Sequence, residues 1–143
     1  MKVKQISVFL ENKTGRLAAV TNALGSNQIN IRALSIADTS DFGILRLIVD
    51  QPDKAYEILK AKDFTVSVTD VIGVEMPDQP GGLAKVLSEL EEAKINIEYL
   101  YAFLGRGERG ALVVFRVEDI DSAIEKLAKS GLNVLKGEEI YKM

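Results

Sequence analysis

Two stretches of this sequence are similar to each other. Residues 15–31 are GRLAAVTNALGSNQINI, and residues 81–97 are GGLAKVLSELEEAKINI. A shift of 66 positions superimposes them, and the identical pairs are Gly15 and Gly81, Leu17 and Leu83, Ala18 and Ala84, Val20 and Val86, Leu24 and Leu90, and Ile29-Asn30-Ile31 with Ile95-Asn96-Ile97. Self-similarity at a fixed period indicates that one structural unit is used more than once. The sequence therefore predicts two copies of a small module.

The repeat continues to the end of the chain at a slightly longer spacing. Past the middle of each copy the best shift is 68, and it aligns Val49 with Val117, Ala55 with Ala123, Leu59 with Leu127, and Val66 with Val134. The extra length falls between residues 103 and 111, where Gly105, Gly107 and Gly110 favour a turn. We place the first copy at residues 1–70 and the second at residues 71–143. Apolar residues alternate from Val66 to Met76 and predict one strand, or two end to end, joining the copies.

Each copy has the order strand, helix, strand, strand, helix, strand. In the first copy, alternation over residues 6–10 predicts a strand and the apolar spacing after Gly15 predicts a helix. Residues 29–37 and 43–49 form a predicted hairpin around Asp38-Thr39-Ser40-Asp41, and a second helix starts near Pro52. This βαββαβ order folds most simply as a four-stranded antiparallel sheet with both helices on one face, a ferredoxin-like α+β unit. Its second strand lies at a sheet edge, where unpaired backbone groups need a partner.

Composition narrows the chemistry that the chain can perform. The 143 residues are 47% hydrophobic, and the net charge of −3 is unlike the basic surface that nucleic-acid binding needs. There is no histidine and no cysteine, which removes imidazole bases, thiolate nucleophiles and the usual transition-metal ligands. We therefore expect no metal and no cofactor. The N-terminus leads directly into a strand pattern and no apolar stretch has membrane-spanning length, so we expect a cytoplasmic protein.

A loop that ends in Gly and Leu, followed later by Ile-Asn-Ile, occurs in both copies. Together these motifs resemble the ACT domain, a regulatory module of many amino-acid-metabolism enzymes, whose pattern is roughly Asp-x-Pro-Gly-x-Leu and then a Gly-x-Ile-Asn-Ile-like strand. The second copy matches with Asp78-Gln79-Pro80-Gly81-Gly82-Leu83, whereas the first, Asn12-Lys13-Thr14-Gly15-Arg16-Leu17, has Asn for Asp and Thr for Pro. The resemblance covers essentially the whole chain. It implies a stand-alone, non-catalytic tandem ACT protein, with edge strands paired between modules and an amino-acid effector at the module junction.

The same two motifs supply the candidate binding residues. A glycine turn leading into a helix presents free N–H groups at the positive end of the helix dipole, which suits a carboxylate, and an asparagine offers both a donor and an acceptor. The candidate ligand-binding residues are Asn12, Thr14, Gly15, Arg16, Leu17, Asn30 and Ile31 in the first copy, and Asp78, Gln79, Gly81, Gly82, Leu83, Asn96 and Ile97 in the second. The departures in the first copy leave open whether there are two sites or one.

Each candidate also has a purely structural explanation. In this alternative the glycines serve only turn geometry, and the two asparagines bond their own backbone. Thr14 and Asp78 would then cap the helices that follow them, and Arg16 would be a solvated surface side chain. The sequence does not choose between these explanations and ligand contact.

Three other functions compete with metabolite binding. Tyr99, Tyr101 and Phe103 share one face of a predicted strand, as in a base-stacking RNA platform, although only Arg106 and Arg109 lie nearby and the net charge is negative. We expect this aromatic row to pack against the other copy or against a second subunit in a homodimer instead. Catalysis lacks a recognisable acid/base motif, and a protein-interaction scaffold without a ligand is the remaining alternative. Our interpretation is a regulatory protein with an amino-acid effector and an amino-acid-metabolism enzyme or regulator as partner.

Overall fold

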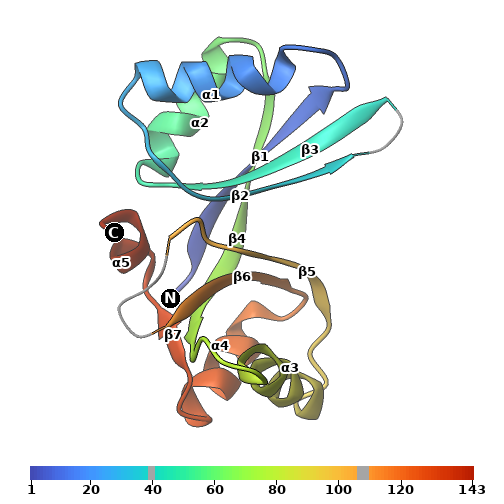
Figure 1. Cartoon of the computed structure of the whole chain (residues 1–143), viewed down its shortest axis with the longest axis vertical. Helices are drawn as coiled ribbons and strands as arrows, with labels where there is room; N and C mark the ends of the chain where they lie inside the picture. The colour runs from blue at the N-terminus through green and yellow to red at the C-terminus, as the bar shows by residue number, and fades with distance from the viewer. Residues whose placement is uncertain (39–40, 106–109) are drawn as a thin grey trace. The chain divides into compact units, whose positions relative to one another are not determined.

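The computed structural model describes residues 1–38, 41–105 and 110–143. The chain forms two compact units (Figure 1). The first unit comprises Lys4–Thr69 with Tyr141–Met143, and the second comprises Asp70–Ile140 with Met1–Val3. No helix in the described residues is both long enough and apolar enough to cross a membrane.

The first unit is a four-stranded antiparallel sheet covered by two helices. Its elements are β1 (Val3–Glu11), α1 (Arg16–Ser26), β2 (Ile31–Asp38), β3 (Phe42–Val49), α2 (Pro52–Ala61) and the first part of β4 (Thr65–Met76). The strand order is β2-β3-β1-β4, with Ile6 opposite Leu47 in the central pair. Alternate residues of the strands pack against Leu24 of α1 and Leu59 of α2 in one apolar core, so both helices cover the same face (Figure 1).

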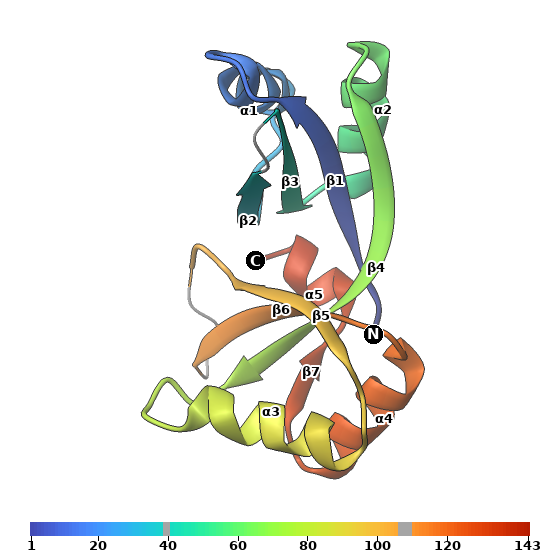
Figure 2. The same ribbon diagram turned by 90° about the vertical axis from the view of Figure 1, so that its right-hand side faces the viewer.

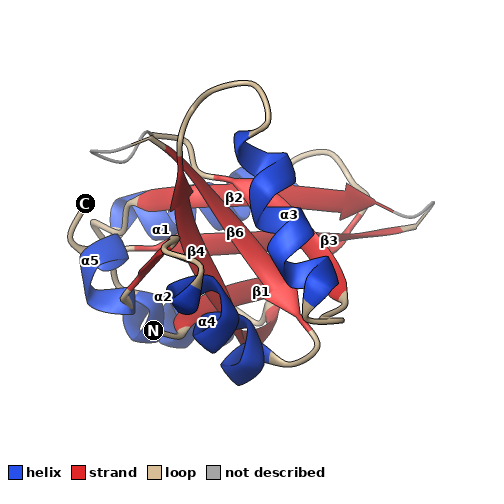
Figure 3. Ribbon diagram, turned by 90° about the horizontal axis from the view of Figure 1, so that it is seen from below, coloured by secondary structure: helices blue, strands red, loops and turns tan. Residues whose placement is uncertain are grey.

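The second unit repeats this architecture. It uses the rest of β4 followed by α3 (Gly82–Glu92), β5 (Ile97–Ala102), β6 (Ala111–Val117), α4 (Ile120–Lys129), β7 (Asn133–Leu135) and α5 (Gly137–Tyr141). The strand order is β5-β6-β4-β7, and Leu90 of α3 and Leu127 of α4 share its core with Phe115 of β6. Helices α3 and α4 lie on one side of these strands (Figures 2 and 3). The predicted α+β class with two ferredoxin-like modules is confirmed.

Three details differ from the expectation or extend it. The alternating run at the copy boundary forms a single strand, β4, rather than two. The last predicted strand of the second copy is only the three residues of β7, and the chain continues into α5, which the sequence pattern did not predict. Helix α5 lies on the strand face opposite α3 and α4 (Figure 2), where Ile140 packs so tightly on Gly73 that a Cβ at Gly73 would meet its Cδ1 at 2.6 Å.

The turn positions named from sequence fall partly outside the described residues. Thr39 and Ser40 of the first hairpin, and Arg106, Gly107 and Arg109 of the second, belong to the segments that are not described. The ends of both hairpins are described: β2 pairs with β3 as far as Asp38 and Gly43, and Phe103 donates its N–H to the carbonyl of Leu112 at 3.1 Å.

The second strand of each copy is an edge strand, as predicted. Among the described residues β2 pairs only with β3, and β5 pairs only with β6. Both strands begin with a shift of register, between Ile31 and Ala33 in β2 and between Ile97 and Tyr99 in β5. The duplication therefore extends to an irregularity just after each Ile-Asn-Ile motif.

All four long helices end in the same turn. The residue after each C-cap has a positive φ: Gln28 (60°), Asp63 (65°), Lys94 (59°) and Gly131 (77°). The next amide then bonds back to a leucine carbonyl, in the pairs Ile29–Leu24 (3.0 Å), Phe64–Leu59 (3.1 Å), Ile95–Leu90 (2.9 Å) and Leu132–Leu127 (3.0 Å). This is the Schellman arrangement, in which the left-handed residue lets the chain reverse and an apolar residue packs back on the helix.

The positive φ at these turns makes a stability prediction. Gly131→Ala places a Cβ on a residue held at φ 77°, and we expect it to lower the free energy of unfolding by about 1 kcal/mol. Gly25→Ala is the matched control, because Gly25 lies in α1 with open space around it and alanine there should add about 0.5–1 kcal/mol. Urea unfolding followed by circular dichroism measures both. Shifts of the same sign in the two variants would contradict the prediction.

Candidate functional site

The two candidate loops connect a central strand to the first helix of each unit. In each loop the helix N-cap is a glycine in the left-handed conformation, Gly15 with φ 90° and Gly81 with φ 85°, and neither cap has a side-chain hydrogen bond. The capping position is therefore a glycine in both copies, rather than Thr14 or Asp78. The first amide of each helix is already used inside the loop, since Arg16 donates to the Lys13 carbonyl at 3.3 Å and Gly82 donates to the Gln79 carbonyl at 3.0 Å. Only the later amides of the first turn are left at the positive end of the helix dipole.

Most of the candidate loop residues are exposed. In the first copy Asn12, Thr14, Gly15 and Leu17 are exposed and Arg16 is half-buried; in the second Asp78, Gln79, Gly81 and Leu83 are exposed and Gly82 is buried. The two leucines near the glycines, Leu17 and Leu83, have 41% and 38% of their surface exposed. Both loops therefore present amides and a leucine side chain to solvent.

The first loop carries its own charges. Lys13 Nζ lies 2.9 Å from Glu11 Oε2, and this hydrogen bond and the charge of Lys13 lower the pKa of Glu11, with a smaller contribution from Arg16. The Arg16 guanidinium lies over the Phe64 ring, 5.3 Å from its centroid. Its Nε is buried and has no hydrogen-bond partner among the described residues. Arg16 is thus packed on an aromatic ring rather than fully solvated, which corrects the alternative that treated it as a free surface residue.

The second loop is shaped by close backbone contacts. A Cβ on Gly82 would lie 2.2 Å from the Pro77 carbonyl oxygen, and one on Gly110 would lie 2.1 Å from the Met76 carbonyl oxygen. The glycine at position 82 is therefore required by packing, whatever else the loop does. In the first copy the equivalent position is Arg16, so the two loops differ in shape at this point.

Asn30 and Asn96 occupy equivalent positions just before the edge strands. Their backbone carbonyls accept from the amides of Asp50 (3.1 Å) and Glu118 (3.0 Å), and Asp50 Oδ1 also accepts from the Asn30 amide at 2.9 Å. Neither side-chain amide has a hydrogen-bond partner within residues 1–38, 41–105 and 110–143. The alternative that these side chains bond their own backbone is therefore wrong. Ile31 and Ile97, the next residues, are half-buried and begin β2 and β5.

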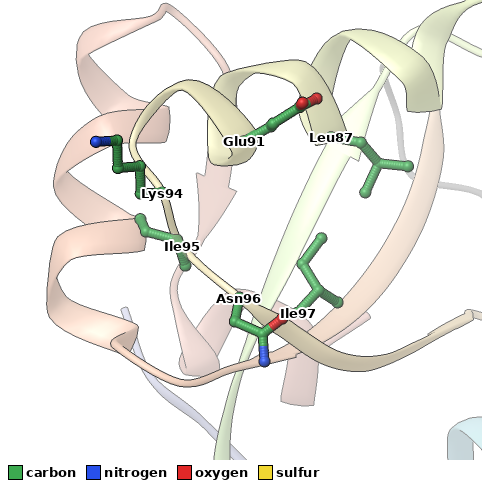
Figure 4. A pocket seen from close by; sticks show the side chains of 6 residues that line it. All are labelled: Leu87, Glu91, Lys94, Ile95, Asn96 and Ile97. Atoms are coloured by element: carbon green, nitrogen blue, oxygen red, sulfur yellow. The ribbon is translucent and has the colours of Figure 1, made fainter.

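One groove brings part of the predicted set together. Asn96 and Ile97 line a groove of about 410 Å³ with four residues that were not predicted, namely Leu87 and Glu91 of α3 and Lys94 and Ile95 of the turn that follows it (Figure 4). The groove is shallow and open to solvent, unlike the small-molecule sites that bury most of their ligand. The loop Asp78–Leu83 precedes the opposite end of α3 and does not contribute to the lining.

Helical spacing in the sequence contains a signal for this groove, which a search for repeated residues does not detect. Leu87 and Glu91 are four residues apart on α3, which places them on one helix face, and Lys94 follows the helix. These positions differ between the copies, so a search for repeated residues passes over them. Among the described residues no group of acidic, cysteine or histidine side chains is arranged to hold a metal ion.

The aromatic row of the second copy is present on β5. The rings of Tyr99 and Tyr101 stack on each other, with centroids 6.4 Å apart and planes 20° apart. Phe103 lies next to Gly73, whose Cβ position would be 3.8 Å from its ring.

Comparison with known proteins identifies relatives of the whole chain. Residues 1–143 match the family described as the ACT domain pair. Protein BT0572 from Bacteroides thetaiotaomicron is 46% identical, and its crystal structure matches with a TM-score of 0.94 over 100% of this chain and 98% of that chain. No curated protein matches the chain.

More distant structures share the fold. The ligand-free regulatory subunit of aspartate kinase from Thermus thermophilus has 16% identity and a TM-score of 0.63, over 88% of this chain and 90% of that chain. The corresponding regulatory subunit from Thermus flavus has 14% identity and a TM-score of 0.59, over 90% of this chain and 92% of that chain. At these identities the likeness concerns architecture alone.

The close contact at Gly82 can be tested directly. Gly82→Ala forces its Cβ against the Pro77 carbonyl, and overpacking of this kind is expected to lower the free energy of unfolding by about 1–3 kcal/mol. Gly105→Ala is the control, because nothing lies within 4 Å of its Cβ position and its backbone needs no positive φ. Thermal unfolding of the two variants should show a loss for Gly82→Ala only. An unchanged melting temperature in Gly82→Ala would contradict the packing role.

Proposed function

This chain belongs to the family of ACT domain pairs, and from that premise we propose that it is a regulatory protein, without catalytic activity of its own, that binds an amino-acid-like small molecule. ACT domains are regulatory modules, and the chain is matched from its first residue to its last by the paired form. The proposal extends to this chain a regulatory role of the kind carried by the aspartate kinase subunits that share its fold.

The observation that carries the proposal is the pair of free asparagine amides. Asn30 and Asn96 repeat at equivalent positions, both are exposed, and neither side chain has a partner among the described residues. A carboxamide offers two donors and an acceptor, so each can bind a ligand's amino and carboxylate groups. In the second copy Asn96 is also part of the lining of an open surface groove.

The candidate loops supply a second kind of contact. The first turns of α1 and α3 place the positive end of a helix dipole at each loop, which suits a carboxylate, although the Arg16 and Gly82 amides already donate to the carbonyls of Lys13 and Gln79. The fourteen residues predicted from sequence thus remain the proposed contact set, with Gly82 acting through packing. Leu87, Glu91, Lys94 and Ile95 are added to it by the groove.

Regulation requires a partner protein that binds the ligand-bound and the ligand-free forms of this chain with different affinities. We expect this partner to be an enzyme or regulator of amino-acid metabolism in the cytoplasm. The coupling is reciprocal, so binding of the partner changes the affinity for the metabolite by the same factor as the metabolite changes the affinity for the partner.

A ligand screen tests the proposed function. In thermal-shift measurements against the twenty amino acids, we expect at least one to raise the melting temperature, because a ligand at a hundred times its dissociation constant adds about 2.7 kcal/mol to the native state. Asn96→Ala should reduce the shift. Asn22→Ala is the matched control, since Asn22 is exposed on α1 outside every candidate contact. A chain that responds to no amino acid would favour the scaffold alternative.

Homodimerisation through the aromatic row is a separate prediction. Analytical ultracentrifugation at micromolar concentration is expected to show a species of twice 15.7 kDa that dissociates on dilution. Tyr99→Lys introduces a charge into the stacked pair and should shift the equilibrium towards the monomer. A species of 15.7 kDa at every concentration would rule out the dimer.

A further inference from the structure

The sheet of the first unit has one face that its two helices do not cover. Ile6, Val8 and Leu10 of β1 pack in the core with α1 and α2, so the alternate residues Ser7 and Phe9 point to the opposite face. This face has a shallow pocket of about 70 Å³ that is partly open to solvent. The lining of this sheet pocket includes Ser7 and Phe9 of β1, Ile44 of β3, and Thr65 and Ser67 of β4.

Two phenylalanine rings lie exposed beside the sheet pocket. Phe9 and Phe42 have 51% and 46% of their surface exposed, and their ring centroids are 5.7 Å apart. In the ladder between β1 and β3, Phe9 lies opposite Ile44 and Phe42 lies opposite Glu11, so both rings are on the uncovered face. Neighbouring exposed apolar side chains next to a pocket are typical of a surface that contacts another molecule.

The sheet pocket has a counterpart in the second unit. Phe9 pairs with Ile44 in the first unit, and at the equivalent position Glu75 pairs with Leu112 in the second, so the two ladders have the same register. At the shifts of 66 and 68 positions, the equivalent pairs are Ser7 and Gly73, Phe9 and Glu75, Ile44 and Leu112, Thr65 and Asn133, and Ser67 and Leu135.

Helix α5 occupies this counterpart in the second unit (Figure 2). Ile140 of α5 is fully buried, and its Cδ1 lies 2.6 Å from the position that a Cβ on Gly73 would take. Leu112 and Leu135 are buried as well. Their equivalents in the first unit, Ile44 and Ser67, are half-buried and exposed. The second unit therefore fills this place with one branched aliphatic side chain from a short helix.

The first unit has no counterpart of α5 because its sequence is used differently at that point. At the shift of 68 positions, α5 (Gly137–Tyr141) corresponds to residues 69–73. These residues continue β4 from the first unit into the second, so they form a strand instead of a short helix. A helix that covers the sheet pocket as α5 covers its counterpart therefore comes from another molecule.

The size and chemistry of the sheet pocket define the group that fits it. A water-sized group needs about 10–15 Å³ of volume measured in this way, so the pocket holds about five such groups. That is the space of one isoleucine or leucine side chain, and it is too small for most metabolites. None of the described residues that line the pocket is charged, which also favours an apolar side chain.

We propose that the sheet pocket, together with Phe9 and Phe42, is a docking surface for a partner protein that inserts one branched aliphatic side chain from a short helix. The two phenylalanine rings contact the residues of that helix that flank the inserted side chain. The inference rests on the proposed function only for the existence of a partner, and it adds the surface at which the partner binds.

The segment that fills the counterpart provides a probe for this surface. The capped peptide of residues 136–143 is titrated into the isotope-labelled full chain at millimolar concentration, and the backbone amides are followed by two-dimensional NMR. We expect saturable shifts at the amides of Ser7, Phe9, Ile44 and Ser67. The same peptide with Ile140→Ala is expected to bind about tenfold more weakly, because it leaves most of the pocket unfilled.

Variants of the full chain test the pocket itself. Ser67→Tyr places a ring in the pocket from β4 and is expected to abolish saturable binding of the peptide. Ser26→Tyr is the matched control, because Ser26 is exposed on α1, on the other side of the sheet, and it should leave binding unchanged. Phe9→Ala removes apolar surface without overpacking and should weaken the peptide by about fivefold. Circular dichroism checks that each variant is folded.

The possible outcomes separate the occupants of the surface. No shift at the sheet-pocket amides, equal affinity for the two peptides, or binding that persists in Ser67→Tyr would overturn the docking surface. Shifts confined to the residues around Gly73 would overturn it as well, since the peptide would then only replace α5. Shifts of the sheet-pocket amides on dilution of the chain alone would assign the surface to a second copy instead of a partner. Thermal shifts with amino acids test the proposed function separately, and their absence would leave the docking surface standing.

Discussion

The turn that ends each helix determines where the candidate site lies. The Ile95 amide bonds the Leu90 carbonyl at 2.9 Å while Lys94 adopts φ 59°, and together these stop α3 and redirect the chain into β5. Asn96 and Ile97 follow immediately, so the same reversal that closes the core also forms the groove wall. Because α1 ends identically at Leu24, Gln28 and Ile29, Asn30 reaches the corresponding place in the first unit.

Backbone requirements explain the glycines of the repeated motif but not its asparagines. Gly15 and Gly81 adopt positive φ at the helix N-caps, and Gly82 meets the Pro77 carbonyl too closely for any side chain. By contrast, the side chains of Asn30 and Asn96 form no hydrogen bond within the described residues. These two exposed side-chain amides are therefore the part of the motif that no contact within the described residues explains.

The sequence predicted the fold because both copies carry the same apolar periodicity. Val66, Ile72, Val74 and Met76 alternate across the copy boundary, and they pack in the two cores from a single strand. The helix α5 was missed because its five residues are too short for a helical repeat to be recognised. The groove was missed because Leu87, Glu91 and Lys94 are not repeated, and its shape depends on a turn geometry that periodicity does not encode.

The two copies share a backbone plan but differ in the charges around the first helix. In the first unit Glu11, Lys13 and Arg16 surround the loop before α1, whereas in the second Asp78 lies in the loop before α3, Glu91 in the last turn of α3 and Lys94 in the turn that follows. A ligand shifts a conformational equilibrium only by its difference in affinity between two states. Two copies with identical sites would bind the same ligand and change conformation together. Because the charges differ between the copies, an effector can bind one unit while the other unit remains available to a partner protein.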